Sequence, residues 1–256
     1  MGCAIVMLSL TACAPMGADD EDPGPSIPAT PQASPTPESP SPSATPEPPA
    51  EPEFDRSARS IDDPASLWVV VNKARPLVPV DYVPGDLVSA AVPATNPPTL
   101  RPEAADALVA MFDAARAELG LTLQSQSAYR SYTTQQSIFT DRLAREGRER
   151  TELFSARPGH SEHQTGLAVD IGLPSGECSF DACFGETGAG IWLAENAHRF
   201  GFLLRYPDGL QPIVGFGYEP WHFRYIGPEL SAEMHEQGVA TLEEFFGLPA
   251  APDYLD

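Results

Sequence analysis

Apolar positions recur with a helical period in several stretches of the chain. Residues 102–119 are one such stretch, with Pro102 in the first turn, apolar residues at Leu108 and Phe112, and Gly120 as a stop. A second helix is expected over 132–145, where Ser131 is a suitable N-cap. Further helices are predicted at 188–200, at 228–237, and from Thr241, which begins a Thr-x-x-Glu capping box.

Short apolar runs between these helices predict strands. They are 67–71, 121–128, 168–173, 202–206 and 221–226. Because strands and helices are mixed without regular β-α-β alternation, we predict an α+β fold with a mostly antiparallel sheet flanked by helices.

The first sixty residues follow a different pattern. Residues 3–12 form an apolar run that is too short to span a bilayer but suits the core of a secretory signal. Leu10-Thr11-Ala12-Cys13, at the end of this run, is similar to a bacterial lipobox, although no Lys or Arg precedes the run. We therefore expect a lipoprotein-type signal over 1–13 with Cys13 lipidated; a plain cleaved signal or a chance apolar leader is the alternative.

Proline dominates the next segment. Twelve of the 29 prolines fall between Pro23 and Pro52, among Ser, Thr, Ala and Glu. Such a composition cannot bury a core and favours extended conformations. We predict a disordered linker over 14–60, acting as a spacer or simply as a tail, and one folded domain over 61–256.

The net charge restricts which partners the protein can bind, and the cysteines indicate the cellular compartment. The net charge of −21 argues against nucleic-acid binding, which needs clustered Lys and Arg. Cys178 and Cys183 could form a disulfide loop or half of a metal site. No second cysteine pair accompanies them in the folded domain, so a disulfide is expected in an exported protein.

Two stretches supply the residues of a hydrolytic zinc site. Ser161 to Asp170 contains His163 and Asp170, and Glu219-Pro220-Trp221-His222 supplies a second imidazole and a free carboxylate. Two His and one Asp leave a zinc position open for water. His160 competes with His163 as a ligand, whereas His198 and His235 fall in predicted helices and are expected to be ordinary helix residues.

The remaining polar residues suggest roles around that metal. Glu219 is the expected general base, and Glu162 is the alternative, although on an extended backbone its side chain would alternate away from His163. Arg130 follows a predicted strand and could bind a substrate carboxylate or stabilise an oxyanion, or it could be an ordinary surface residue. Gly166 and Ala168 are small residues that would let the backbone turn close to the metal.

Several motifs in order resemble the zinc D-Ala-D-Ala carboxypeptidases of VanY type. They are Asn72-Lys73, Tyr82-x-Pro84-x-Asp86-Leu87, Tyr129-Arg130-Ser131-Tyr132-x-x-Gln135, Ser161-x-His163-x-x-Gly166-x-Ala168-x-Asp170 and Glu219-x-x-His222. This family shares its fold with the D-Ala-D-Ala dipeptidases and the hedgehog signalling domain. The resemblance implies that His163, Asp170 and His222 bind Zn2+ and that Glu219 is the base. It also implies that Arg130, Ser161 and Gln135 contact substrate.

The expected activity is removal of the terminal D-Ala from peptidoglycan stem peptides. An L,D-carboxypeptidase or endopeptidase with the same zinc site is the nearer alternative, and a non-catalytic wall-binding lipoprotein the more distant one. We expect a monomer, lipid-anchored on the outer face of the bacterial membrane and facing the cell wall.

Overall fold

The computed structural model describes residues 53–255, so the predicted signal (1–13) with its predicted lipidation site Cys13, and residues 14–52 of the predicted linker, lie outside the described part. The last residues of that linker pack on the folded domain. Phe54 stacks on Trp68 with ring centroids 5.5 Å apart, and Arg56 donates to the carbonyl of Phe245. Within residues 53–255, every helix is too short or too polar to cross a membrane.

A four-stranded antiparallel sheet forms the centre of the domain, in the order β3-β4-β6-β5. Its strands are β3 (Gln124–Ser127), β4 (Ala168–Gly172), β6 (His222–Tyr225) and β5 (Phe202–Leu204). A separate pair is made by β1 (Val88–Ser89) and β2 (Thr99–Leu100). The predicted α+β class with an antiparallel sheet is confirmed, although the strands are shorter than expected.

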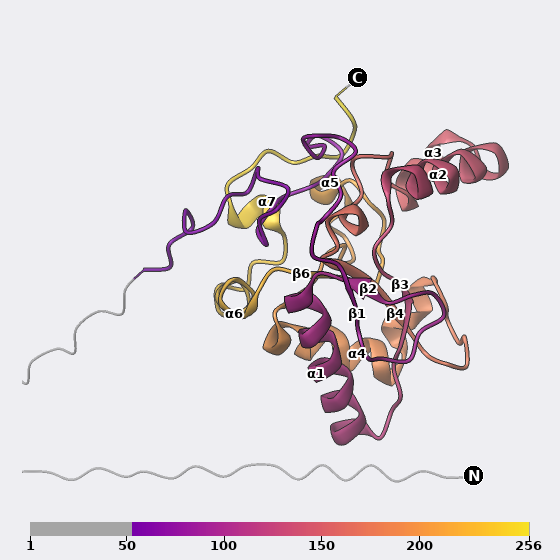
Figure 1. Ribbon diagram of the computed structural model, residues 1–256, viewed down its shortest axis with the longest axis vertical. Helices are drawn as coiled ribbons and strands as arrows, with labels where there is room; N and C mark the ends of the chain where they lie inside the picture. Colours follow the sequence, from indigo (N-terminus) through magenta and orange to yellow (C-terminus); the bar gives the residue numbers. More distant parts are fainter. Residues whose placement is uncertain (1–52, 256) are drawn as a thin grey trace, which may run out of the picture. The chain divides into compact units, whose positions relative to one another are not determined.

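Helices surround this sheet (Figure 1). They are α1 (Pro102–Leu119), α2 (Tyr132–Glu146), α3 (Arg148–Phe154), α4 (Gly188–Asn196), α5 (Gln211–Val214), α6 (Pro228–Gln237) and α7 (Leu242–Phe245). Single 3-10 turns occur at η1 (Glu162–Thr165), η2 (Ala182–Glu186) and η3 (Ala197–Phe200). The α2 N-cap is confirmed, because Ser131 accepts from the Thr134 amide, and so is the α7 cap at Thr241. The α3 helix was not predicted.

The main core lies between α1, α4 and the sheet. The α1 face that includes Leu108, Met111 and Phe112 is buried with Val169, Ile171 and Phe223 of β4 and β6. Burial of that stripe is the main driving force for docking the helix. Because the strands at the centre of the sheet are buried on both faces, a polar side chain on β4 or β6 must find a partner or a ligand.

The predicted strand at 67–71 is wrong. These residues are buried, but they form no strand with the sheet. Instead the guanidinium of Arg224 donates to the carbonyls of Leu67 and Val69, at 3.0 and 2.8 Å. A buried side chain therefore satisfies backbone acceptors that a neighbouring strand would otherwise satisfy.

Candidate active site

The two central strands place Asp170 and His222 opposite each other. Asp170 on β4 is the direct register partner of His222 on β6. Side chains of opposed residues in an antiparallel pair lie on the same face about 5 Å apart. Both side chains are buried, so the antiparallel register itself brings together residues that are 52 positions apart in the chain.

His163 reaches the same place from η1. That 3-10 turn ends at Gly166, which has φ +69° and donates its amide to the carbonyl of His163. A Cβ at Gly166 would lie 2.7 Å from Leu87 and 3.2 Å from Arg101. A side chain at this position would collide with its neighbours, so the close turn expected at Gly166 requires a glycine. The chain enters β4 two residues after this turn.

The tautomer of His163 follows from its hydrogen bond. Nδ1 lies 2.6 Å from the carbonyl oxygen of Ala128, and a carbonyl only accepts, so Nδ1 carries the proton. The lone pair of Nε2 then points toward Asp170, with 3.2 Å between Nε2 and Oδ2. Nε2 is buried and has no hydrogen-bond partner among the described residues. Burial lowers the pKa of His163 to about 4, with a further contribution from Arg130, so the ring is neutral at pH 7.

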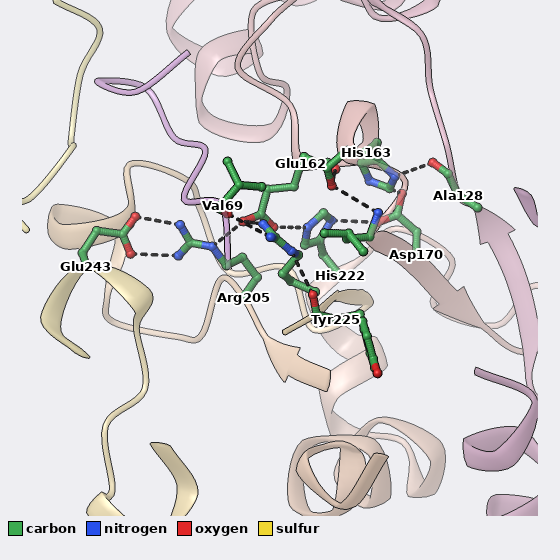
Figure 2. Close-up of polar contacts among 12 residues, drawn as sticks. Val69, Ala128, Glu162, His163, Asp170, Arg205, His222, Tyr225 and Glu243 are labelled. Atoms are coloured by element: carbon green, nitrogen blue, oxygen red, sulfur yellow. Dashed lines mark hydrogen bonds and ion pairs between the residues drawn. The ribbon is translucent and has the colours of Figure 1, made fainter. Parts of the chain in front are cut away.

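His222 lies between two carboxylates (Figure 2). Nδ1 is 3.0 Å from Oδ1 of Asp170, and Nε2 is 3.2 Å from Oε2 of Glu162. Burial alone would lower the pKa of His222, but these two hydrogen bonds raise it to about 9 in the metal-free protein. Asp170 is ionised: burial opposes this, yet His163 and His222 hold its pKa well below the usual value.

These three side chains fit a zinc ion. Candidate ligand atoms of His163, Asp170 and His222 all lie within 4.8 Å of one another. The unpartnered Nε2 of His163 is a buried polar atom that a metal would satisfy. Nδ1 of His222, which faces Asp170, is the corresponding atom on the second imidazole. Two imidazole nitrogens and one carboxylate oxygen are a donor set typical of catalytic zinc, with a fourth position left for water.

Glu162 occupies a different place from the one its sequence position suggested. It does not extend away from the metal group, because η1 replaces the expected extended backbone and turns its carboxylate onto His222. It is also engaged by Arg205 and Arg224. Burial opposes ionisation, but the two guanidinium groups hold the pKa of Glu162 well below its usual value. A carboxylate held so firmly in the ionised state is poorly suited to be a general base.

Glu219 has the opposite environment. Its side chain is 7% exposed, makes no hydrogen bond within the described part of the chain, and lines the cleft beside Asp170. The pKa of Glu219 is raised to about 8, mainly by burial and in part by the nearby Asp170, while His222 and Arg130 oppose the shift. A carboxyl group with its pKa near neutrality, facing an open cleft, can accept and return a proton.

Arg130 lines the same cleft as Glu219 and Asp170. Its backbone amide donates to the carbonyl of His163, which connects the segment that follows β3 to η1. Its Nε is buried without a hydrogen-bond partner among residues 53–255. Burial lowers the pKa of Arg130, while the nearby Asp170 and Glu219 oppose that shift. An unpartnered guanidinium beside the metal group is available for an anionic substrate group.

The other two expected substrate contacts differ in position. Ser161 lines a small cavity of about 60 Å³ together with His163, His222 and Glu219. Gln135 is buried in α2, where its amide donates to the carbonyl of Ala156 at 2.7 Å. Gln135 thus supports the segment before Ser161, and its direct contact with substrate stays a prediction.

The predicted disulfide is confirmed and forms part of the cleft wall. Cys178 and Cys183 are bonded, and the loop between them contributes Phe180, Asp181 and Ala182 to a cleft of about 510 Å³. Phe180 is 52% exposed and packs edge-on against Trp221, the neighbour of His222. Asp170, Glu219 and Arg130 line the same cleft. The loop therefore presents an apolar surface beside the metal group.

The remaining histidines lie elsewhere. Nδ1 of His160 is 2.9 Å from the carbonyl of Asn72, and its ring packs edge-on against Tyr254. His198 and His235 stack on each other with ring centroids 3.5 Å apart. None of these three belongs to the metal group found among the described residues.

Sequence reasoning missed several residues around the site. Tyr206 stacks on the ring of His222, and Arg205 and Arg224 contact Glu162. One signal was available: Arg224 lies two residues after His222 on the same strand and therefore on the same face. Tyr206 and Arg205 come from another strand end, and no local pattern connects them to the metal ligands.

Known proteins resemble this chain along most of its folded part. The family model described as "VanY: D-alanyl-D-alanine carboxypeptidase" matches residues 97–228. A putative carboxypeptidase, YodJ of Bacillus subtilis (strain 168), is 41% identical over 192 residues, which are 73% of this chain and 69% of that protein.

Two solved structures have the same architecture. The LdcB LD-carboxypeptidase is 40% identical, with a TM-score of 0.66 over 72% of this chain and 87% of that one. A variant of the vancomycin resistance D,D-pentapeptidase VanY from a VanB-type cassette, solved with Zn(II), is 34% identical. Its TM-score is 0.59 over 70% of this chain and 98% of that one. With these similarities and the group formed by His163, Asp170 and His222, the chain belongs to the VanY family of carboxypeptidases.

Proposed function

We propose that this protein is a zinc-dependent D,D-carboxypeptidase that removes the terminal D-Ala from peptidoglycan stem peptides. The observation that supports it most directly is one cleft shared by the metal ligand Asp170, the carboxyl group of Glu219 and the guanidinium of Arg130. A carboxypeptidase needs these three elements together: a place for activated water, a proton acceptor, and a cation for the free carboxylate of the substrate.

Each side chain of the site has a distinct role in the proposed reaction. His163, Asp170 and His222 would hold a zinc ion, which would supply Lewis acidity and lower the pKa of water. Glu219 takes a proton from the attacking water and returns it to the leaving amine. Arg130 binds the terminal carboxylate and so orients the last peptide bond within the cleft that Arg130 shares with Glu219. The non-catalytic alternative explains neither the perturbed Glu219 nor the unpartnered Arg130.

An L,D-carboxypeptidase is the second candidate, and one observation favours it. The LdcB LD-carboxypeptidase has both a higher identity and a higher TM-score to this chain than the VanY D,D-pentapeptidase. The two activities differ in the configuration of the residue before the scissile bond, which the cleft wall must distinguish. D,D-carboxypeptidase activity is proposed first because the family model is described as a D-alanyl-D-alanine carboxypeptidase.

The test uses a matched pair of substrates. The purified protein is incubated with a stem pentapeptide ending in D-Ala-D-Ala and with a tetrapeptide ending in one D-Ala, each with and without a zinc chelator. We expect D-Ala release from the pentapeptide that stops on chelation and returns with added zinc. Release from the tetrapeptide alone would assign the L,D activity. Cleavage inside cross-linked peptides would assign an endopeptidase, and release that persists without metal would contradict the mechanism.

We also propose that Cys13 is lipidated and that the domain acts as a monomer on the outer face of the membrane. The apolar run before Cys13 and the Pro-rich segment after it support this arrangement. Stable anchoring requires more than one acyl chain, as a lipoprotein cysteine would provide. Cys13→Ala should release the protein from the membrane fraction, whereas retention of that variant would contradict the anchor.

A further inference from the structure

A chain of buried ionic groups runs from α7 to the metal ligand His222 (Figure 2). At its outer end, the carboxylate of Glu243 receives two hydrogen bonds from the guanidinium of Arg205, at 2.7 and 2.9 Å. The Nε of the same guanidinium donates to Oε1 of Glu162 at 2.8 Å. Oε2 of Glu162 then lies 3.2 Å from Nε2 of His222.

This chain is sealed from water. The side chains of Glu162, Arg205 and Glu243 have 0% exposure. Arg224 completes the set by donating to Oε1 of Glu162 at 3.0 Å, so two guanidinium groups balance two carboxylates. Burying such ions is costly, and a buried ion pair is often no more stabilising than apolar residues of the same size. Stability alone is therefore a weak explanation for four buried charges directly behind the metal group.

The geometry offers a more specific explanation. A bidentate bond to a carboxylate fixes the plane of a guanidinium. With two of its nitrogens held by Glu243, Arg205 can direct Nε only at Glu162. Glu162 is thereby fixed as a charged acceptor for the Nε2 proton of His222. The lone pair of Nδ1 is then left on the side of Asp170, where a metal ion would be bound.

Glu243 is itself held from two directions. The amide of Asn72 donates to Oε1 at 2.9 Å, and α7 is capped by Thr241, which accepts from the Glu244 amide. Asn72 and Glu243 both lie outside residues 97–228, the part matched by the family model. The ionic chain thus connects segments on both sides of the matched region to a metal ligand.

We propose that Glu243, Arg205 and Glu162 are positioning residues of the zinc centre, so that α7 sets the orientation of His222. Outer partners of metal-bound histidines usually contribute 10- to 100-fold to metal affinity, roughly. The proposal concerns zinc binding and does not depend on which peptide is cleaved. Its test needs no substrate.

The first measurement is zinc affinity by chelator competition on the whole chain. Glu243→Gln should weaken zinc binding about tenfold, because the neutral amide holds Arg205 less firmly. Glu236→Gln is the control, since Glu236 is exposed on α6 with no contact to the ionic chain. Thermal unfolding of the zinc-free proteins runs in parallel. Unchanged zinc affinity in Glu243→Gln, with only a lower unfolding temperature, would overturn the proposal.

A double-mutant cycle tests whether Glu243 affects zinc binding through Glu162 or through a general disturbance of the fold. Glu162→Gln should weaken zinc binding more than Glu243→Gln does, because it removes the charged acceptor of His222. In that background, adding Glu243→Gln should change zinc affinity less than twofold. Fully additive effects on zinc affinity would mean that Glu243 does not act through Glu162, and they would refute the proposal.

Arg205→Lys provides a second variant if Glu243→Gln does not fold. It keeps the charge but cannot make the bidentate bond to Glu243 while donating to Glu162. We expect zinc to bind about tenfold more weakly, with an altered absorption spectrum of the Co2+-substituted protein. A wild-type spectrum together with wild-type zinc affinity would contradict the positioning role.

Discussion

Asp170 and His222 are direct register partners on β4 and β6, and Oδ1 of Asp170 lies 3.0 Å from Nδ1 of His222. The two side chains that would bind a metal are therefore hydrogen-bonded to each other when no metal is bound. Zinc and a proton compete for one nitrogen of His222. This competition makes metal binding sensitive to pH.

The first prediction concerns that sensitivity. The metal-free protein has a pKa of about 9 at His222 and about 4 at His163. Between these values His222 carries a proton that zinc must displace, whereas His163 is already neutral. Apparent zinc affinity should rise about tenfold per pH unit from pH 6 to 8, with release of one proton. Titration calorimetry in buffers of different ionisation enthalpy measures that proton, and a flat affinity across this range would contradict the prediction.

The second prediction concerns Glu219→Gln. This variant should bind zinc normally but lose roughly 100- to 10,000-fold in kcat, the usual contribution of a general acid–base group. Because the folded-state pKa of Glu219 is raised to about 8, the metal-free wild type loses stability as pH rises from about 4.5 through 8.

The amide variant lacks this titration, so its zinc-free form should be the more stable one at pH 8. Thermal unfolding at pH 5 and pH 8 measures the difference. Wild-type turnover in Glu219→Gln would show that another group is the base.

The third prediction concerns Arg130. Replacing Arg130 with Ala should lower kcat/KM roughly 10- to 100-fold for a peptide with a free carboxylate, because a hydrogen bond to a charged group contributes about 1.5–3 kcal/mol. A peptide with a C-terminal amide provides the control. The wild type should strongly prefer the free acid, and Arg130→Ala should lose most of that preference. An unchanged preference would place the carboxylate elsewhere.

The fourth prediction concerns Phe180 on the disulfide loop. Phe180→Ala should raise KM several-fold with little change in kcat or zinc affinity, because the exposed ring lines the cleft but does not contact the metal group. Ile191→Ala is the matched control, since Ile191 is an exposed apolar residue on α4 that does not line this cleft. Equal effects of the two substitutions would exclude a specific contact at Phe180.

Local patterns predicted the helices better than the strands. α1 and α6 are delimited by Pro and Gly residues that act within a few positions, so their bounds follow from nearby residues alone. The stretch 67–71 has strand-like composition but forms no strand, because its backbone acceptors are satisfied by Arg224, more than 150 residues away. Strand formation depends on a distant partner, which composition does not reveal.

Residue types and spacings were enough to predict a metal group of two imidazoles and one carboxylate, a second carboxylate for proton transfer, an arginine for an anion and a disulfide loop. Of these predictions, the fold confirms that the metal group comes together and that the disulfide forms. These assignments depend on residue type and short spacings, which are local. The environments of the two acidic residues near the metal group, in contrast, depend on contacts that form only in the folded protein. Glu162 and Glu219 are the same residue type, yet Arg205 and Arg224 keep one firmly ionised behind His222, while burial without a partner raises the pKa of the other to about 8. The reason is physical: a pKa depends on the charges and solvent that the fold places around a group, not on its neighbours in sequence.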